Sequence, residues 1–119
     1  MANIKIKRVY EPASNADGYR VLVDRLWPRG LKKENASVDE WLKEVAPSAG
    51  LRKWFAHEEE KWAAFCEKYK EELKSNNSFD ELKKVVKKHK LVTLLFGAKD
   101  EQHNQAVVLK ELLSDLRFY

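Results

Sequence analysis

The sequence predicts a small, single-domain α/β fold of Rossmann-like, layered type, in which helices flank a short and mostly parallel sheet. Residues 3–10 alternate apolar and polar side chains with a period of two, which is typical of a strand with one buried face. Residues 91–96 form a continuous apolar run, which suits a strand covered on both faces. Helical periodicity fills most of the chain between these strands and returns after the second. We therefore expect one domain over residues 1–119.

A second strand is expected at residues 19–25, where aromatic and β-branched side chains alternate with others. Pro28 and Gly30 end it in a loop. The turn-rich connection from the first strand is short for a parallel crossover, so the relative direction of these two strands is left open.

The middle of the chain is predicted to be helical. Ser37, followed three residues later by Glu40, is a capping-box pattern and predicts a helix that ends at Pro47. Ser48 can cap a short second helix that runs through Phe55.

Residues 58–75 form the longest predicted helix, because their apolar side chains fall on one stripe. Asn76 and Asn77 end it, and Ser78 with Glu81 forms a second capping box that opens the next helix. After the strand at 91–96, a last helix is expected to turn six apolar residues inward: Ala106, Val107, Leu109, Leu112, Leu113 and Leu116.

Composition excludes several classes of protein. Hydrophobic residues make up 44% of the chain and charged residues 35%, which is too apolar for disorder and too charged for a membrane protein. No apolar run has the length of a signal peptide or a membrane span. The single Cys66 excludes an internal disulfide, and the three histidines lack metal-ligand spacing, so we expect a cytoplasmic protein without a metal.

The formal charge of +4 is too small to predict nucleic-acid binding without a basic patch, but it is compatible with a small anionic ligand. Five of the six arginines lie in the first half of the chain. A solvated basic surface is the alternative explanation.

Polar residues follow the second strand, where open α/β sheets bind ligands. Asp24, Arg25, Trp27 and Arg29 could place two guanidinium groups beside an aromatic plane, which suits a phosphate or carboxylate next to a flat ring. The alternative is structural, with Asp24 paired to an arginine and Trp27 packed in the core.

Polar residues also follow the last strand. Asp100 and His103 could act together as acid and base, and Asn104 lies beside them at the start of a helix, where free amides attract anions. The alternative is that Asp100 only caps this helix. His57 can equally cap a helix near Glu58.

Four long strings of this chain resemble the YeaO-like family of small bacterial proteins, part of domain of unknown function 488, over about residues 5–113: KRVY, DGYRVLVDRLWPRG, WLKEVAPSAGLRKWFAH and LLFGAKDEQHNQAVVL. The resemblance implies a compact cytosolic α/β domain. It also implies a set of signature positions, namely Arg8, Asp24, Arg25, Arg29, Lys43, Arg52, His57, Asp100, His103, Asn104, Tyr10, Trp27, Trp41 and Trp54. Many relatives carry His where this chain has Gln105, which makes an essential role for that position doubtful.

The first function hypothesis is an enzyme or enzyme-like domain for a small phosphorylated or nucleotide-like ligand. Its predicted ligand-binding residues are Arg8, Asp24, Arg25, Trp27, Arg29, Arg52, Trp54, His57 and Asn104, and its predicted catalytic residues are Asp100 and His103. The alternatives are a non-catalytic module for nucleotides or nucleic acid, and a protein-interaction domain. No cofactor is assigned, no membrane partner is expected, and the oligomeric state is left open.

Overall fold

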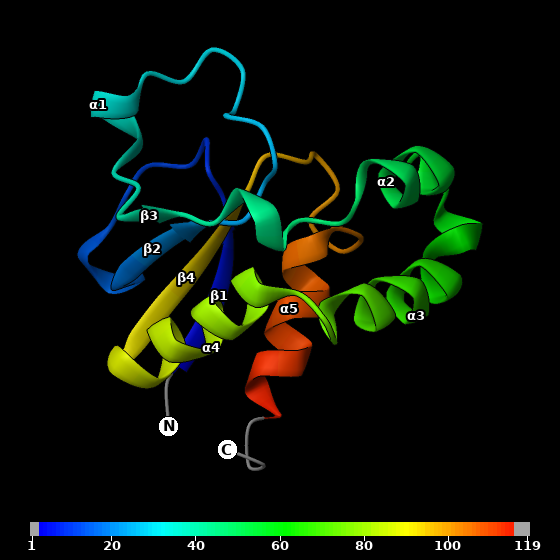
Figure 1. Cartoon of the computed structure of the whole chain (residues 1–119). Coiled ribbons are helices and arrows are strands. Elements are labelled where there is room, and N and C mark those ends of the chain that lie inside the picture. Colours follow the sequence, from blue (N-terminus) through cyan, green and yellow to red (C-terminus); the bar gives the residue numbers. More distant parts are fainter. Residues whose placement is uncertain (1–2, 116–119) are drawn as a thin grey trace.

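A computed structural model, which describes residues 3–115, shows a four-stranded sheet with all strands parallel, in the order β1-β4-β2-β3 (Figure 1). The strands are β1 (Asn3–Arg8), β2 (Tyr19–Leu22), β3 (Glu40–Trp41) and β4 (Leu91–Phe96). The α-helices are α1 (Lys33–Ala36), α2 (Ala49–Phe55), α3 (Trp62–Leu73), α4 (Asn77–Lys88) and α5 (Gln105–Ser114). Short 3-10 helices lie at Asn15–Asp17, Lys43–Val45 and Glu59–Lys61. The predicted α/β class with a parallel sheet is confirmed.

Strand β4 lies at the centre and settles the question left open about the first two strands. It pairs with β1 on one side and with β2 on the other, so β1 and β2 run parallel but do not pair with each other. The connection between them passes close to β4, where the Thr93 hydroxyl donates to the Asp17 carbonyl at 2.6 Å. Gly18 makes this approach possible, because it has a φ of 65° and a Cβ there would lie 2.3 Å from the Leu91 carbonyl oxygen.

The main core covers one face of the sheet. Val21 and Val23 of the β2 segment point into it, as do Val92, Leu94 and Phe96 of β4, and the alternation follows the period of two expected of strands. Helices α3, α4 and α5 contribute buried side chains to this core, and Figure 1 shows α4 in front of the lower part of the sheet and α5 beside β1. The long helices are thus gathered on one side of the sheet.

The opposite face holds a smaller cluster, built around Leu22 and Leu95. The partly buried side chains that pack against it are Trp27 and Leu31 of the loop after β2, Val38 just before β3, and Trp41 of β3. Trp27 and Trp41 pack there edge to face, with ring centroids 5.4 Å apart, and the Trp27 indole N–H donates to the Leu31 carbonyl at 2.6 Å. Trp27 is therefore packed in a core cluster, as the structural alternative expected.

The helix predicted from Ser37 to Pro47 is wrong. Ser37 instead ends the one-turn helix α1 with a φ of 51°, and the chain then runs extended into β3. Glu40 does not cap, because its carboxylate accepts from the Tyr19 hydroxyl at 2.9 Å. The Trp41 indole N–H donates to the Asp24 carbonyl at 2.7 Å. These long-range contacts outweigh the local capping pattern.

Two other helix starts also differ from the prediction. Helix α4 is capped by Asn76, whose side chain accepts from the Phe79 amide, and not by Ser78. Helix α5 is capped by Asn104, so the alternative in which Asp100 caps this helix is wrong.

The Ser48 cap of α2 is confirmed, because the hydroxyl accepts from the Leu51 amide at 3.1 Å. The helix predicted at residues 58–75 forms as a 3-10 turn followed by α3. On α5, Val108 is fully buried, Val107 and Leu112 are only partly buried, and Leu116 lies outside the described residues.

No helix among residues 3–115 has an apolar stretch long enough to cross a bilayer.

Candidate functional site

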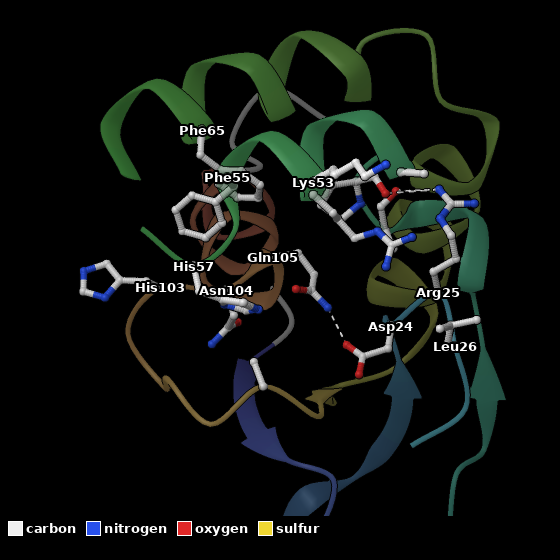
Figure 2. A pocket seen from close by; sticks show the side chains of 15 residues that line it. Asp24, Arg25, Leu26, Lys53, Phe55, His57, Phe65, His103, Asn104 and Gln105 are labelled. Carbon is white, nitrogen blue, oxygen red and sulfur yellow. Dashed lines mark hydrogen bonds between the residues drawn. The ribbon is translucent and has the colours of Figure 1, made fainter. Parts of the chain in front are cut away.

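A pocket of about 590 Å³ opens at the carboxyl ends of β2 and β4, and we call it the strand-end pocket (Figure 2). The segment after β2, helix α2, the loop after β4 and the start of α5 form its walls. It is lined by Asp24, Arg25, Leu26, Ala46, Pro47, Ala49, Arg52, Lys53, Phe55, His57, Phe65, Ala98, His103, Asn104 and Gln105. This is the edge at which open parallel sheets bind ligands, and its size suits a small molecule.

Asp24 lies at the base of the pocket, between the ends of the two strands. Its carboxylate accepts from the Gly97 amide at 2.8 Å and from the Gln105 side-chain amide. Burial raises the pKa of Asp24, while the bonds from Gly97 and Gln105 and the charge of Arg52 oppose it, so that the pKa stays above its usual value. The structural alternative paired Asp24 with an arginine. The structure instead shows the Asp24 carboxylate bonded to the Gly97 amide and the Gln105 side chain.

The cations of the pocket differ in what they already bind. The Arg25 guanidinium donates to the carbonyls of Ala46 and Pro47, at 3.0 and 3.3 Å, and to Glu44 at 3.3 Å. Arg25 therefore stabilises the segment at Ala46 and Pro47 that leads into α2. In the part of the chain that the structure describes, the side chains of Arg52 and Lys53 make no hydrogen bond or ion pair. These two groups remain available to a ligand.

His103 lines the pocket and is held between two carboxylates. Its Nδ1 lies 2.9 Å from the Asp100 carboxylate, and its Nε2 lies 3.7 Å from that of Glu59. The ring also packs edge-on against Trp62, with centroids 5.1 Å apart. Hydrogen bonds from the Gln102 amide and from His103 lower the pKa of Asp100. Asp100 orients the imidazole but does not itself line the pocket.

The N-terminus of α5 is closed by its own cap. The Asn104 side-chain oxygen accepts from the amides of Ala106 and Val107, at 2.9 and 3.2 Å. Those two amides are therefore not open to an anion. Asn104 also donates from its side-chain nitrogen to the Asp100 carbonyl at 2.9 Å, which fixes the loop after β4.

His57 reaches the pocket through an unusual backbone turn. Ala56 and His57 both have positive φ values, 46° and 56°, immediately after α2. The His57 ring lies 5.9 Å from the Phe55 ring, and Figure 2 shows both on the same side of the pocket. The 3-10 helix that follows has Glu58 as its N-cap without a side-chain bond, so His57 does not cap it.

The chain can be assigned to a family by its sequence. Residues 3–117 match the family described as "Inactive DUF488-N3 subclade". The chain belongs to this family. It is 46% identical to "Uncharacterized protein YeaO" of Escherichia coli (strain K12) over 114 residues, which cover 96% of this chain and 99% of that protein. It is 39% identical to an uncharacterized protein of Mycobacterium tuberculosis (strain ATCC 25618 / H37Rv) over 111 residues, 93% of each chain. No solved structure matches it significantly.

In this DUF488-N3 member, six of the predicted site residues come together around the strand-end pocket: Asp24, Arg25, Arg52, His57, His103 and Asn104. Five others lie outside its lining. Besides Asp100, Trp27 belongs to the second core cluster. The Arg8 guanidinium donates to the carbonyls of Gly97 and Ala98. Arg29 is exposed on the loop after β2. The Trp54 ring lies against the amines of Lys61 and Lys68, at 5.1 and 5.0 Å.

Two polar residues of the pocket lining, Gln105 and Lys53, were not among the predicted ligand-binding residues. Gln105 was set aside because of its departure from the family pattern, yet it contacts Asp24 directly. Its place at the start of the helix that follows the last strand was the signal that could have found it. Lys53 follows Arg52 on α2, and only the placement of α2 beside the sheet reveals it.

Within residues 3–115 no group of three or more acidic, histidine or cysteine side chains could hold a metal ion. The pocket offers two cations without partners among the described residues, a partly buried carboxyl, an amide and an apolar wall. That arrangement can bind a small molecule that has an anionic group at one end and polar groups at the other.

Proposed function

We propose that this protein is a binding module for a small phosphorylated ligand, held without catalysis in the strand-end pocket. The observation that carries this proposal is the pair of cations, Arg52 and Lys53, which line the pocket without hydrogen-bond partners in the described residues. Guanidinium and ammonium groups so placed favour an oxyanion, and a guanidinium can bind a phosphate through two parallel hydrogen bonds.

Two observations favour binding over catalysis. The family to which the chain belongs is described as inactive. In the pocket, the side-chain partner of the partly buried Asp24 carboxyl is the Gln105 amide, which neither gains nor loses a proton near neutral pH. Asp24 is therefore placed to accept hydrogen bonds and not to pass a proton to a neighbour.

An enzyme is the second candidate, and His103 favours it. The imidazole lines the pocket while Asp100 holds its Nδ1, which is the arrangement that a general base requires. Phosphate release from ribose 5-phosphate or AMP by the wild-type protein, lost in His103→Gln, would support this candidate and contradict the non-catalytic proposal.

A thermal-shift experiment tests the proposal, with inorganic phosphate, pyrophosphate, ribose 5-phosphate and AMP as probes. A ligand at a hundred times its dissociation constant stabilises the fold by about 2.7 kcal/mol, which raises the melting temperature of a domain of this size by several degrees. Arg52→Ala should abolish the shift, because it removes the guanidinium that faces the ligand.

Arg29→Ala is the matched control, because Arg29 is an exposed arginine outside the pocket lining. We expect its ligand-induced shift to equal that of the wild type. A flat response of the wild type to every probe would contradict the proposal, as would equal losses in the two variants. Short single-stranded oligonucleotides serve as a further probe, and binding to them that weakens steeply with salt would favour a nucleic-acid ligand instead.

A further inference from the structure

The polar base of the strand-end pocket, formed by Asp24 and Gln105, presents hydrogen-bond acceptors. The Gln105 side chain lies between two acceptors, the Asp24 carboxylate and, at 3.5 Å, the Val23 carbonyl. Its amide nitrogen must face them, so its carbonyl oxygen turns the other way, as Figure 2 shows. The Asp24 carboxylate and the Gln105 carbonyl, whose side chains are joined by this hydrogen bond, are therefore two acceptor groups in the lining of the pocket.

The Asp24 carboxylate keeps capacity for a ligand. Its two oxygens each accept one hydrogen bond, one from Gly97 and one from Gln105. An ionised carboxylate offers about four lone-pair sites, so acceptor positions remain. A ligand group with two adjacent hydrogen-bond donors therefore matches Asp24 and Gln105 better than a ligand group that can only accept.

The anion-binding groups are close to this base. Arg52 and Asp24 line the same pocket, and the charge of Arg52 lowers the pKa of Asp24 in part against the larger raising effect of burial. Phe55 and Phe65 provide an apolar wall of the same pocket. The pocket is thus positive where Arg52 and Lys53 line it, accepting at Asp24 and Gln105, and apolar along the wall formed by Phe55 and Phe65.

We propose that the ligand of this pocket is a phosphorylated molecule that also carries two adjacent hydrogen-bond donors, with the phosphate on Arg52 and the donors on Asp24 and Gln105. The inference rests on the proposed function and specifies it further. Two sources supply such donors: the cis-diol of a ribose, and the N1–H and N2–H edge of a guanine. A pocket of about 590 Å³ has room for a mononucleotide.

Calorimetric titration with three probes tests the inference: inorganic phosphate, ribose 5-phosphate, which has the diol, and 2′,3′-dideoxyguanosine 5′-monophosphate, which has only the guanine edge. We expect one of the two organic probes to bind wild-type protein at least ten-fold more tightly than phosphate. The tighter probe identifies the source of the donors.

The variant Asp24→Asn gives effects of opposite sign on the two kinds of probe. It should weaken the preferred organic probe about ten-fold or more, because a charged acceptor is lost. It should tighten inorganic phosphate, because a carboxylate that repels the anion is gone. Gln105→Met, which keeps the side-chain length but removes the acceptor, should lower the preference over phosphate several-fold and provides the test if Asp24→Asn does not fold.

The outcomes separate this inference from the proposed function. Phosphate binding in wild type without preference for either organic probe overturns the inference alone. Equal weakening of phosphate and the organic probe by Asp24→Asn does the same. Failure of all three probes to bind wild type overturns both the inference and the proposed function. Arg29→Ala serves as the control for surface charge.

Discussion

Gly97 determines how closely Asp24 can approach the end of β4. The Gly97 amide donates to the Asp24 carboxylate at 2.8 Å, and a Cβ on Gly97 would lie 2.9 Å from the same oxygen. A side chain at residue 97 and the carboxylate at its present position are therefore incompatible. The contact between the Asp24 side chain and the Gly97 backbone thus favours glycine here, whereas the backbone φ of Gly97 does not call for one.

Gly97→Ala should therefore destabilise the fold by about 1–3 kcal/mol, since an extra methyl group in a tight site forces its neighbours to move. It should also weaken any ligand that binds Asp24. Urea denaturation measures the first effect and calorimetric titration the second.

Gly50→Ala is the matched control, because nothing lies within 4 Å of a Cβ at that helical position. It should be neutral or stabilising by about 0.5–1 kcal/mol, since alanine favours helix more than glycine does. Equal destabilisation by the two substitutions would show that the Asp24 contact is not what Gly97 provides.

Single residues also show why the sequence placed the site only in part. Arg25, Arg29 and Arg52 look alike in the sequence, but Arg25 binds carbonyls, Arg29 lies on the surface and Arg52 faces the pocket. Which role an arginine takes depends on where α2 packs, and that is a property of the folded chain.

At the scale of elements, the helix caps decide where the chain turns. Asn76, Ser78 and Asn104 are all residue types that favour N-caps. The Asn76 side-chain oxygen accepts from the Phe79 amide at 3.0 Å, and its amide nitrogen donates to the Glu44 carbonyl at 2.9 Å. The second bond, to a residue far away in sequence, favours Asn76 over Ser78 as the cap.

Asn76→Ala should cost about 1 kcal/mol of stability, because an amide at the start of α4 loses its partner. Ser78→Ala should change stability by less than about 0.5 kcal/mol, since Ser78 lies within the helix and caps nothing. Chemical denaturation of both variants at neutral pH measures the difference. A larger loss for Ser78→Ala would contradict the assignment of the cap.

Strand β3 shows the limit of local patterns. Glu40, the first of its two residues, belongs to a capping-box pattern with Ser37, yet Glu40 and Trp41 pair with Val21 and Leu22 of β2. A strand this short has too few residues to show a period of two. Its existence depends on Trp41 and Glu40 finding partners on β2 and in the loop that follows it.

At the scale of the whole molecule, a buried ionic network joins segments across the sheet. The Asp17 carboxylate contacts the Lys7 amine at 3.1 Å and the Arg20 guanidinium. Arg20 also donates to the carbonyls of Ala36 and Ser37, at 3.1 and 2.9 Å. The network thereby connects β1, β2 and α1, and Asp17 and Arg20 are each only 4% exposed.

Asp17→Asn should destabilise the fold by about 3–5 kcal/mol at neutral pH, because it leaves the Arg20 charge buried without its partner. Burial raises the pKa of Asp17, but the hydrogen bonds from Ser14, Lys7 and Arg20 together lower it by more. The pKa of Asp17 in the folded state therefore lies below the ordinary value of 3.8. The stabilisation is therefore present above that value and is lost as the pH falls below it. The difference between wild type and variant should shrink below about pH 3.8, as measured by denaturation over a pH series.

Glu71→Gln is the control for this network. Glu71 and Lys74 form an ion pair at 3.1 Å in which both side chains are more than 70% exposed. We expect a change below about 0.5 kcal/mol, because water screens such a pair. If the Asp17→Asn effect had the same size at pH 3 and pH 7, the ionic explanation would be contradicted.

The sequence by itself determined the α/β class, the strands at β1, β2 and β4, the helices α2 and α3, and the polar character of both strand ends. Those features follow from periodicity, residue propensity and the length of apolar runs, all of which act between near neighbours. Only the tertiary structure decided that β4 separates β1 from β2, that residues 40–41 form a strand, and that Arg52, Lys53, Asp24 and Gln105 share one pocket. These outcomes depend on contacts between residues far apart in the chain, whose free energies exceed the local preferences that a sequence pattern records.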